Sequence, residues 1–302
     1  MSYSGMIRCW ESHSAGLTLP DCRSPTHWEA LSISVRGARH VEDGTECQDA
    51  WLTSPTDSAD RYRISAVADG HGHRRHPRSR WGAIKAVEIA VAHSERYVSV
   101  LLEEEAHPCD ETTRTLLKAI HTEWMCAVRD HFREFTTSSD LQELSDEERA
   151  RIIAVPEIAY GATLLVVIVT REWWLALQLG DGDIMVVSSE GRSSLAIEPF
   201  PSIDSQTHSL CSSSPWELAR SRFVPCGSGV RPLLLMLSTD GYKESFGQLG
   251  DFLEVGTDLM RAIRAIGLKR VLEFLPEHLS DISARGSGDD ITLSALIPCP
   301  MR

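Results

Sequence analysis

Residues 61–70 read RYRISAVADG, a run of strand-forming residues that ends in Asp-Gly. Two more segments end in the same way, WWLALQLGDG at 173–182 and LLLMLSTDG at 233–241. A fourth, GSGDDITLSALI at 286–297, has its acidic pair first and the apolar strand after it. The acidic residues at these strand ends are Asp69, Asp181, Asp240 and Asp289. If the strands lie side by side, these carboxylates gather at one sheet edge, where their mutual repulsion favours a hard metal cation between them.

Each Asp-Gly pair has an alternative interpretation as a hairpin turn, for which this dipeptide is preferred. After AVADGHG (66–72), however, the chain continues with HRRHPRSRWGA and a helical pattern, whereas a hairpin needs a partner strand at once. That favours Asp69 as a ligand. STDG (238–241) is equally compatible with a turn and with a ligand. QLGDGD (178–183) lies between two expected strands, so Asp181 can equally be a plain turn residue.

Two further motifs gain meaning from the set. GSGDDIT (286–292) places adjacent carboxylates at a strand entrance, either as surface decoration or as ligands, and the flanking glycines favour ligands. Asp49 in CQDAW (47–51) says little by itself. Together with His71, the five aspartates and a basic stretch suit phosphate chemistry, and oxygen ligands select Mg²⁺ or Mn²⁺ over zinc. The basic residues are Arg74, Arg75, Arg78 and Arg80.

The composition is that of a globular protein. The chain has 302 residues, 42% of them hydrophobic and 24% charged, with a net charge of −13. This charge disfavours nucleic acid and anionic membrane surfaces as partners. No apolar run approaches the roughly 20 residues that span a bilayer, and the N-terminus does not resemble a secretory signal. The eight cysteines form no CxxC pair, so we expect buried free thiols in a reducing cytoplasm.

Hydrophobic periodicity predicts the order of the elements. Strands are expected at 28–37, 47–54, 63–69, in a three-strand meander at 160–191, at 231–241 and at 291–297. Helices are expected at 80–104, 112–135, 144–154 and, broken near Gly267, at 258–283. A Gly-containing turn should follow the first strand. Ser145 and Glu148 have the spacing of a capping box at the start of the third helix.

The strands come in consecutive runs and do not alternate with helices. This order favours an α+β fold or a four-layer αββα sandwich with two mostly antiparallel sheets. Residues 1–27 are expected to be an irregular extension, and residues 28–302 a single domain. The Ser- and Pro-rich segment 192–230 is expected to be a surface loop with short helical pieces, acting as a flap.

The motifs together resemble the type 2C metal-dependent Ser/Thr protein phosphatases. The resemblance runs from about residue 28 to residue 297 and rests on CQDAW, VADGHG, YGATLLV, LGDGD, LSTDGYKESF and GSGDDITL. It is strongest to a bacterial subgroup, because of CQDA near the start and STDG later. The resemblance implies an αββα sandwich with the metals in a channel at one edge of the β-sandwich.

The resemblance also implies roles for individual residues. Asp69 matches the carboxylate that bridges both metals, and Gly70 the ligand that uses its backbone carbonyl. Asp240 and Asp289 match the other direct ligands of the second metal. The remaining matches are Asp49 for the acid that holds metal-bound water, Asp181 for the acid of a third, weaker metal site, and His71 for the general acid.

The chain departs from the family pattern at several positions. Gly44 stands where an Arg often contacts the substrate phosphate, and the candidates to replace it are Arg39, His40 and, more remotely, Arg74. Gln48 replaces a frequent Glu, and Gly-Asp-Gly-Asp replaces the usual Gly-Asp-Ser-Arg. Asp290 stands where Asn is frequent. The direct ligands remain intact, so we expect an active enzyme.

The implied function is hydrolysis of phosphoserine and phosphothreonine in proteins by a water activated between two Mn²⁺ or Mg²⁺ ions. Such an enzyme would act on a phosphorylated protein and oppose a Ser/Thr kinase in the cytoplasm. The missing Arg favours one alternative, an inactive regulatory module of the same fold that binds a kinase or another signalling protein. A second alternative is a metal-dependent phosphoesterase that acts on a small molecule.

Overall fold

The computed structural model describes residues 27–55, 61–135, 141–198, 208–227 and 231–299. Over these ranges the chain forms two antiparallel sheets of five strands each. Sheet 1 has the spatial order β1 (His27–Val35), β10 (Ile291–Cys299), β9 (Leu234–Ser238), β6 (Asp183–Val187) and β7 (Ser193–Leu195). Sheet 2 has the order β2 (Ala50–Ser54), β3 (Tyr62–Ala68), β4 (Leu164–Thr170), β5 (Trp173–Leu179) and β8 (Arg220–Pro225).

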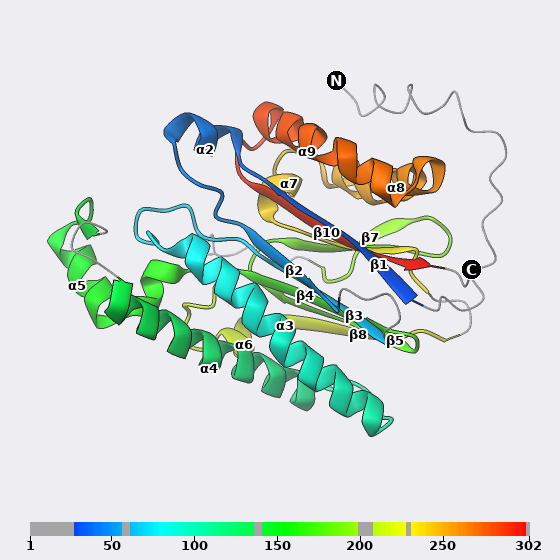
Figure 1. The fold of residues 1–302 in the computed structure, drawn as a ribbon, viewed down its shortest axis with the longest axis horizontal. Coiled ribbons are helices and arrows are strands. Elements are labelled where there is room, and N and C mark those ends of the chain that lie inside the picture. Colours follow the sequence, from blue (N-terminus) through cyan, green and yellow to red (C-terminus); the bar gives the residue numbers. More distant parts are fainter. Residues whose placement is uncertain (1–26, 56–60, 136–140, 199–207, 228–230, 300–302) are drawn as a thin grey trace.

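The two sheets are stacked between two pairs of helices (Figure 1). Sheet 1 packs against α8 (Leu249–Ile266) and α9 (Leu268–Arg285), and sheet 2 against α3 (Ser79–Glu103) and α4 (Asp110–Phe135). A third apolar cluster fills the space between the sheets. These layers confirm the predicted α+β fold, a four-layer αββα sandwich with antiparallel sheets.

The centre of sheet 2 explains why its strands are continuous apolar runs. Every residue of β4 and β5 is buried. Successive side chains of β4 alternate between the two faces: Ile168 packs toward the helices, and Val167 toward sheet 1. A strand covered on both faces has no solvent side to mark with polar residues.

The predicted helices are all present, and their ends shift by one or two residues except at the start of α8. Ser145 caps α5 (Asp146–Ala154): its hydroxyl accepts from the Glu148 amide at 3.2 Å, and its own amide donates to the Glu148 carboxylate at 3.0 Å. The break between α8 and α9 falls at Gly267, whose φ of 84° favours glycine. α8 starts at Leu249, earlier than the periodicity indicated.

The predicted three-strand meander is wrong in its last strand. β4 and β5 form a hairpin in sheet 2, but β6 crosses to sheet 1 and pairs with β9 and β7. The apolar run of β6 shows that the strand is buried, and it does not show which sheet the strand joins.

Two other segments also differ from the prediction. A short helix, α2 (Ala38–Asp43), follows β1 where a turn was expected. The segment 192–230 contains strands β7 and β8 as well as the short helix α6 (Pro215–Leu218), so it is not loop throughout. Its residues 199–207 and 228–230 lie outside the described ranges, as do residues 1–26 of the expected extension, and β1 already begins at His27.

The cysteines in the described ranges are all free thiols, as expected, but only Cys226 is buried. Cys109 and Cys126 are exposed, so the expectation of burial is wrong for them. Among the helices of the described residues, none combines the length and the apolarity that a membrane span requires.

Candidate metal centre

Strand ends from both sheets bring the acidic residues together. In sheet 2, Asp49 precedes β2 and Asp69 follows β3, and these strands are antiparallel neighbours. In sheet 1, Asp240 follows β9 and Asp289 precedes β10, which are again antiparallel neighbours. The two sheets meet where the Thr239 hydroxyl donates to Asp49 Oδ2 at 2.9 Å. The four acids therefore share one edge of the sandwich.

The carboxyl groups of Asp69 and Asp240 lie within hydrogen-bond reach of each other across the two sheets. Burial raises the pKa of Asp69, and the neighbouring charges of Asp49, Asp240 and Asp289 raise it further. Burial also raises the pKa of Asp240 to about 6, helped by repulsion from Asp181, against a hydrogen bond with Asp69 that lowers it. Without a metal ion, burial and mutual repulsion therefore disfavour the ionised forms of these carboxyl groups.

Two threonine hydroxyls hold the buried carboxylate of Asp49. Thr239 donates to Asp49, and the Thr292 hydroxyl is its second donor. The backbone amide of Thr292 donates in turn to the Thr239 hydroxyl at 2.9 Å. Burial raises the pKa of Asp49, as does the charge of Asp290, whereas the two hydroxyl bonds lower it. Thr239 and Thr292 therefore favour the ionised carboxylate.

The backbone at Asp69 and Gly70 is fixed by the YGAT segment. The Asp69 amide donates to the Thr163 hydroxyl at 3.0 Å, and its carbonyl accepts from the Thr163 amide at 2.9 Å. A Cβ on Gly70 would lie 2.7 Å from the Gln48 carbonyl oxygen and 2.9 Å from Ser79, so the site has room only for glycine. No hairpin forms here, because the chain runs on into α3.

His71 lies in a pair of imidazoles next to this turn. Its ring centroid is 4.9 Å from that of His76, and its amide donates to the Gly161 carbonyl at 3.1 Å. Gly161 makes the room, since a Cβ there would lie 2.6 Å from the His71 ring and 2.7 Å from the His76 ring. Burial lowers the pKa of His71, and the Asp181 carboxylate partly offsets this. Burial, followed by the charge of His71, lowers the pKa of His76 to about 4.

Asp181 occupies the crossover from sheet 2 to sheet 1. Gly180 has a φ of 108°, and a Cβ on Gly182 would lie 2.8 Å from the Ser238 carbonyl oxygen, so the crossover requires both glycines. Since β5 and β6 lie in different sheets, the alternative of a hairpin turn at Asp181 is wrong. The crossover places the Asp181 charge close enough to shift the pKa values of both Asp240 and His71.

Asp290 is buried, with 4% of its surface exposed, and it anchors the segment that follows β1. Its carboxylate accepts from the backbone amides of Gly37 at 2.6 Å and of Gln48 at 2.7 Å. It also lies 2.9 Å from His40 Nδ1. Gly241 packs so closely on this loop that a Cβ there would overlap the carbonyl oxygen of Asp290.

The three candidates for the phosphate contact lie in different surroundings. His40 Nε2 lies 3.8 Å from Asp289 Oδ1. A Cβ on Gly72 would lie 3.9 Å from the same His40 Nε2. The Arg39 guanidinium donates to the carbonyl of Ser287. Arg74 forms an ion pair of 3.2 Å with Glu148 on α5. The structure thus brings His40 to the acidic edge and engages Arg74 elsewhere.

The donor set fits a hard divalent cation. It consists of carboxylates and the backbone carbonyl of Gly70, and the raised pKa values show that an added positive charge would relieve repulsion.

Sequence reasoning missed Thr239, Thr292 and His76. The two threonines had a signal, since Thr239 directly precedes Asp240 and Thr292 is two residues after Asp290. His76 had none beyond its place in a His- and Arg-rich stretch.

Comparisons with known proteins agree with this architecture. Residues 36–276 match the family model described as Protein phosphatase 2C, which covers more than half of the chain. A comparison with curated protein sequences gives no match.

Three solved structures share the fold. A bacterial serine phosphatase is 12% identical, with a TM-score of 0.55 and coverage of 91% of this chain and 100% of its own. PppA, a key regulatory component of T6SS in Pseudomonas aeruginosa, is 15% identical, with a TM-score of 0.51 and coverage of 91% and 99%. The Mycobacterium tuberculosis serine/threonine phosphatase PstP/Ppp is 11% identical, with a TM-score of 0.52 and coverage of 91% and 100%. With its family match, its two-sheet sandwich and its acidic edge, this chain belongs to the protein phosphatase 2C family.

Proposed function

We propose that the protein hydrolyses phosphoserine and phosphothreonine in other proteins, using two Mn²⁺ or Mg²⁺ ions held at the acidic edge. The observation that carries the proposal is the meeting of Asp69 and Asp240 from opposite sheets. Two bound cations would lower the pKa of an attacking water and offset charge on the phosphoryl oxygens. The substrate would be a phosphoprotein of a Ser/Thr kinase pathway in the cytoplasm.

The chain's own residues would divide the work of holding the ions. We assign Asp69 to both ions, Gly70 to a ligand role through its backbone carbonyl, and Asp240 and Asp289 to the second ion. Asp49 would orient water in the ions' outer shell, because Thr239 and Thr292 fix its carboxylate. Asp181, on the crossover, would serve a third and weaker ion.

His71 would donate the proton that the leaving serine or threonine oxygen needs. Its place next to Asp69 supports this role. Burial lowers its pKa, so the imidazolium is a stronger acid than in water, and the Asp181 carboxylate favours the protonated form. His71→Asn should therefore slow turnover of a phosphothreonine peptide more than that of an aryl phosphate. Equal losses on both substrates would contradict the acid role.

We propose His40 as the residue that contacts the substrate phosphate in place of the missing Arg. Asp290 Oδ1 lies 2.9 Å from Nδ1 of this ring, whereas Nε2 lies on the side of Asp289 and Gly72. The neighbouring Gln48 Oε1 is buried and has no hydrogen-bond partner among the described residues, so it can accept from an N–H group of a bound substrate peptide. His40→Gln should raise KM for the peptide more than it lowers kcat.

The segment 192–230 would act as a flap over the site. The part that follows residues 199–207 contacts the YGAT segment. The Leu210 amide donates to the Ala162 carbonyl at 2.9 Å, and the Ala162 amide donates to the Ser209 hydroxyl at 3.0 Å. The neighbouring Thr163 holds Asp69. Limited proteolysis of the free protein should cut within 192–230 first.

One observation favours the alternative of a regulatory module. Gly44 directly follows α2 with a φ of 76°, a conformation that favours glycine. Glycine has no side chain that could contact a phosphate. Metal binding separates the two functions, because an inactive module need not retain Mn²⁺.

The decisive assay compares phosphothreonine and phosphotyrosine peptides with Mn²⁺ and after EDTA. We expect turnover of phosphothreonine only with metal, and activity that survives EDTA would overturn the two-metal proposal. Residues that only support a metal ligand contribute roughly 10- to 100-fold to activity. Asp240 is assigned as a ligand itself, so Asp240→Ala should lower turnover by more than this. A panel of small phosphate esters tests the remaining alternative of a small-molecule phosphoesterase.

A further inference from the structure

A second group of metal-binding side chains lies at the other end of sheet 1. In the β1–β10 ladder, Val35 pairs with Ile291 beside the acidic edge, and His27 pairs with Cys299 at the opposite end. With the usual rise per residue, the two ends are about 26 Å apart. Glu29 follows His27 on the same face, because side chains alternate along a strand. This group therefore shares no residue with the candidate metal centre.

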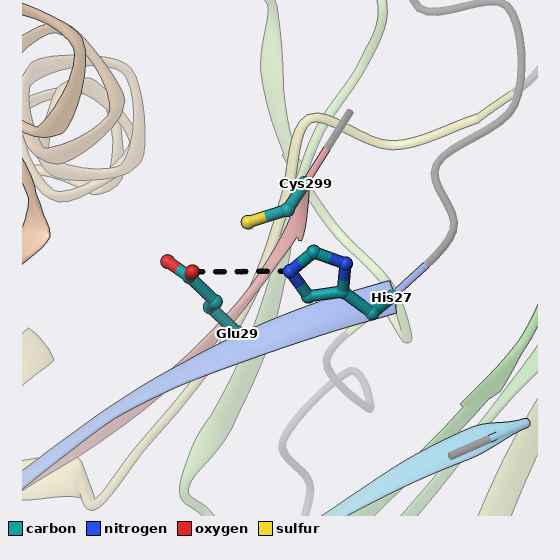
Figure 2. Close-up of side chains that lie close together, drawn as sticks. All are labelled: His27, Glu29 and Cys299. Carbon is teal, nitrogen blue, oxygen red and sulfur yellow. Dashed lines mark ion pairs between the residues drawn. The ribbon is translucent and has the colours of Figure 1, made fainter. Parts of the chain in front are cut away.

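These three residues interrupt an apolar face. On the same side of the ladder, Leu31 and Ile297 are buried beneath the helices. The last rungs replace such residues by an imidazole, a carboxylate and a thiol. Figure 2 shows the three side chains on the same side of the ladder, turned toward one another. The side chain of His27 is 22% exposed and that of Glu29 43%, so the group is open to ions from solution.

The distances suit a small cation. His27 Nε2 and Glu29 Oε1 are 3.9 Å apart, which is longer than a hydrogen bond. One ligand atom from each of the three residues lies within 4.8 Å of the others. The ligand atoms of a tetrahedral zinc ion, with bonds of 2.0–2.3 Å, are about 3.3–3.8 Å apart. Side-chain rotation alone can close this difference, since the strands already hold the three residues in register.

The donor chemistry selects the metal. One nitrogen, one sulfur and one oxygen are the ligand types of zinc, whereas the acidic edge offers only oxygen and suits Mg²⁺ or Mn²⁺. An exposed His–Glu ion pair alone would add little stability, and the contact of the Cys299 thiol with the Ile297 carbonyl oxygen, at 3.9 Å, is a weak one. A metal bound here would join the first and last strands of the described chain, and its binding free energy would add to that of folding.

We propose that His27, Glu29 and Cys299 bind a zinc ion, with water in the fourth position. The test titrates Co²⁺ into reduced full-length protein that has been stripped of transition metals and is kept in excess Mg²⁺ to occupy the acidic edge. A thiolate on cobalt produces a charge-transfer absorption in the near ultraviolet. We expect this band to saturate at one equivalent and to disappear when Zn²⁺ is added. Cys299→Ser should abolish it, and His27→Gln and Glu29→Gln should weaken cobalt binding.

Cys47 is the matched control, because it is the thiol next to the acidic edge. Burial, followed by the charges of Asp49 and Asp290, raises its pKa to about 12, which disfavours a thiolate there. Cys47→Ser should keep the band. Zn²⁺ should raise the Tm of the wild type and of Cys47→Ser, and it should leave the Tm of Cys299→Ser unchanged. The proposal is overturned if no band forms, if the band survives in Cys299→Ser, or if Cys47→Ser removes it. Mn²⁺-dependent phosphatase activity should be unchanged in Cys299→Ser, so this test is independent of the proposed function.

Discussion

The ammonium group of Lys243 lies 2.7 Å from Oδ2 of Asp183 and 3.5 Å from the backbone carbonyl oxygen of Asp181. Lys243 ends α7 (Asp240–Lys243), which begins with a candidate ligand, and Asp183 begins β6 directly after the crossover. Asp183 is only 4% exposed. Burial raises its pKa, and the Lys243 charge opposes that shift. This ion pair therefore joins the segments that carry Asp240 and Asp181.

Lys243→Met should destabilise the protein, because it removes the cation in contact with a buried carboxylate and leaves only the more weakly acting charge of Arg220. Lys243 is 31% exposed on its side chain, so we expect a loss of about 1–3 kcal/mol in the free energy of unfolding, below the figure for a fully buried pair. Urea denaturation measures it.

The control for this pair is the double variant Lys243→Met/Asp183→Asn. It removes both charges, so it should recover part of the stability that the single variant loses. If the double variant is no more stable than Lys243→Met, the two side chains are not coupled.

Asp240→Asn should separate stability from metal binding. It removes one of the carboxylates that repel each other at the acidic edge, so the metal-free protein should gain about 1–3 kcal/mol of stability. The same change removes a candidate ligand, so Mn²⁺ should no longer raise the Tm. Calorimetric Mn²⁺ titration and thermal unfolding measure the two effects. A variant that binds Mn²⁺ like the wild type would refute the assignment of Asp240.

The stability of the metal-free protein should depend on pH through Asp240. The pKa of this group is raised from 3.8 to about 6 in the folded protein. Protonated Asp240 therefore stabilises the folded protein below its unfolded-state pKa of 3.8, and this stability is lost as the pH rises through its folded-state pKa of about 6. Between about pH 5 and about pH 7, the Tm of the metal-free wild type should fall relative to that of Asp240→Asn. Parallel pH profiles of the two proteins would contradict this prediction.

Gly241→Ala should disrupt the site without removing any chemical group. A Cβ at this position would overlap the carbonyl oxygen of Asp290, so the loop that carries Asp289 must shift. We expect weaker Mn²⁺ binding and a lower Tm. Gly247→Ala is the matched control, since a Cβ there meets nothing within 4 Å and its backbone φ is not positive. Equal behaviour of the two variants would show that the close approach at Gly241 is unimportant.

Local patterns predicted the parts of the fold that depend on nearby residues. The apolar runs of β4 and β5, the capping box of Ser145 and the break at Gly267 all appear where expected. The sheet that β6 joins was not predictable, because a short apolar run such as residues 184–187 suits the interior of either sheet. β8 was missed because its segment is rich in Ser and Pro and its strand lies at a sheet edge with exposed residues.

For the candidate site, the sequence by itself determined which residue types are available and that several of them end strands. Asp-Gly after an apolar run places a carboxylate at a strand end whatever the rest of the chain does. Which of these ends meet was decided only by the tertiary structure. The stacking of two sheets brings Asp69 to Asp240 and directs Thr239 to Asp49, and the pairing of β6 with β9 within sheet 1 brings Lys243 to Asp183. The reason is physical: contacts between residues far apart in the chain follow from how the buried faces pack, and a local pattern carries no information about its distant partner.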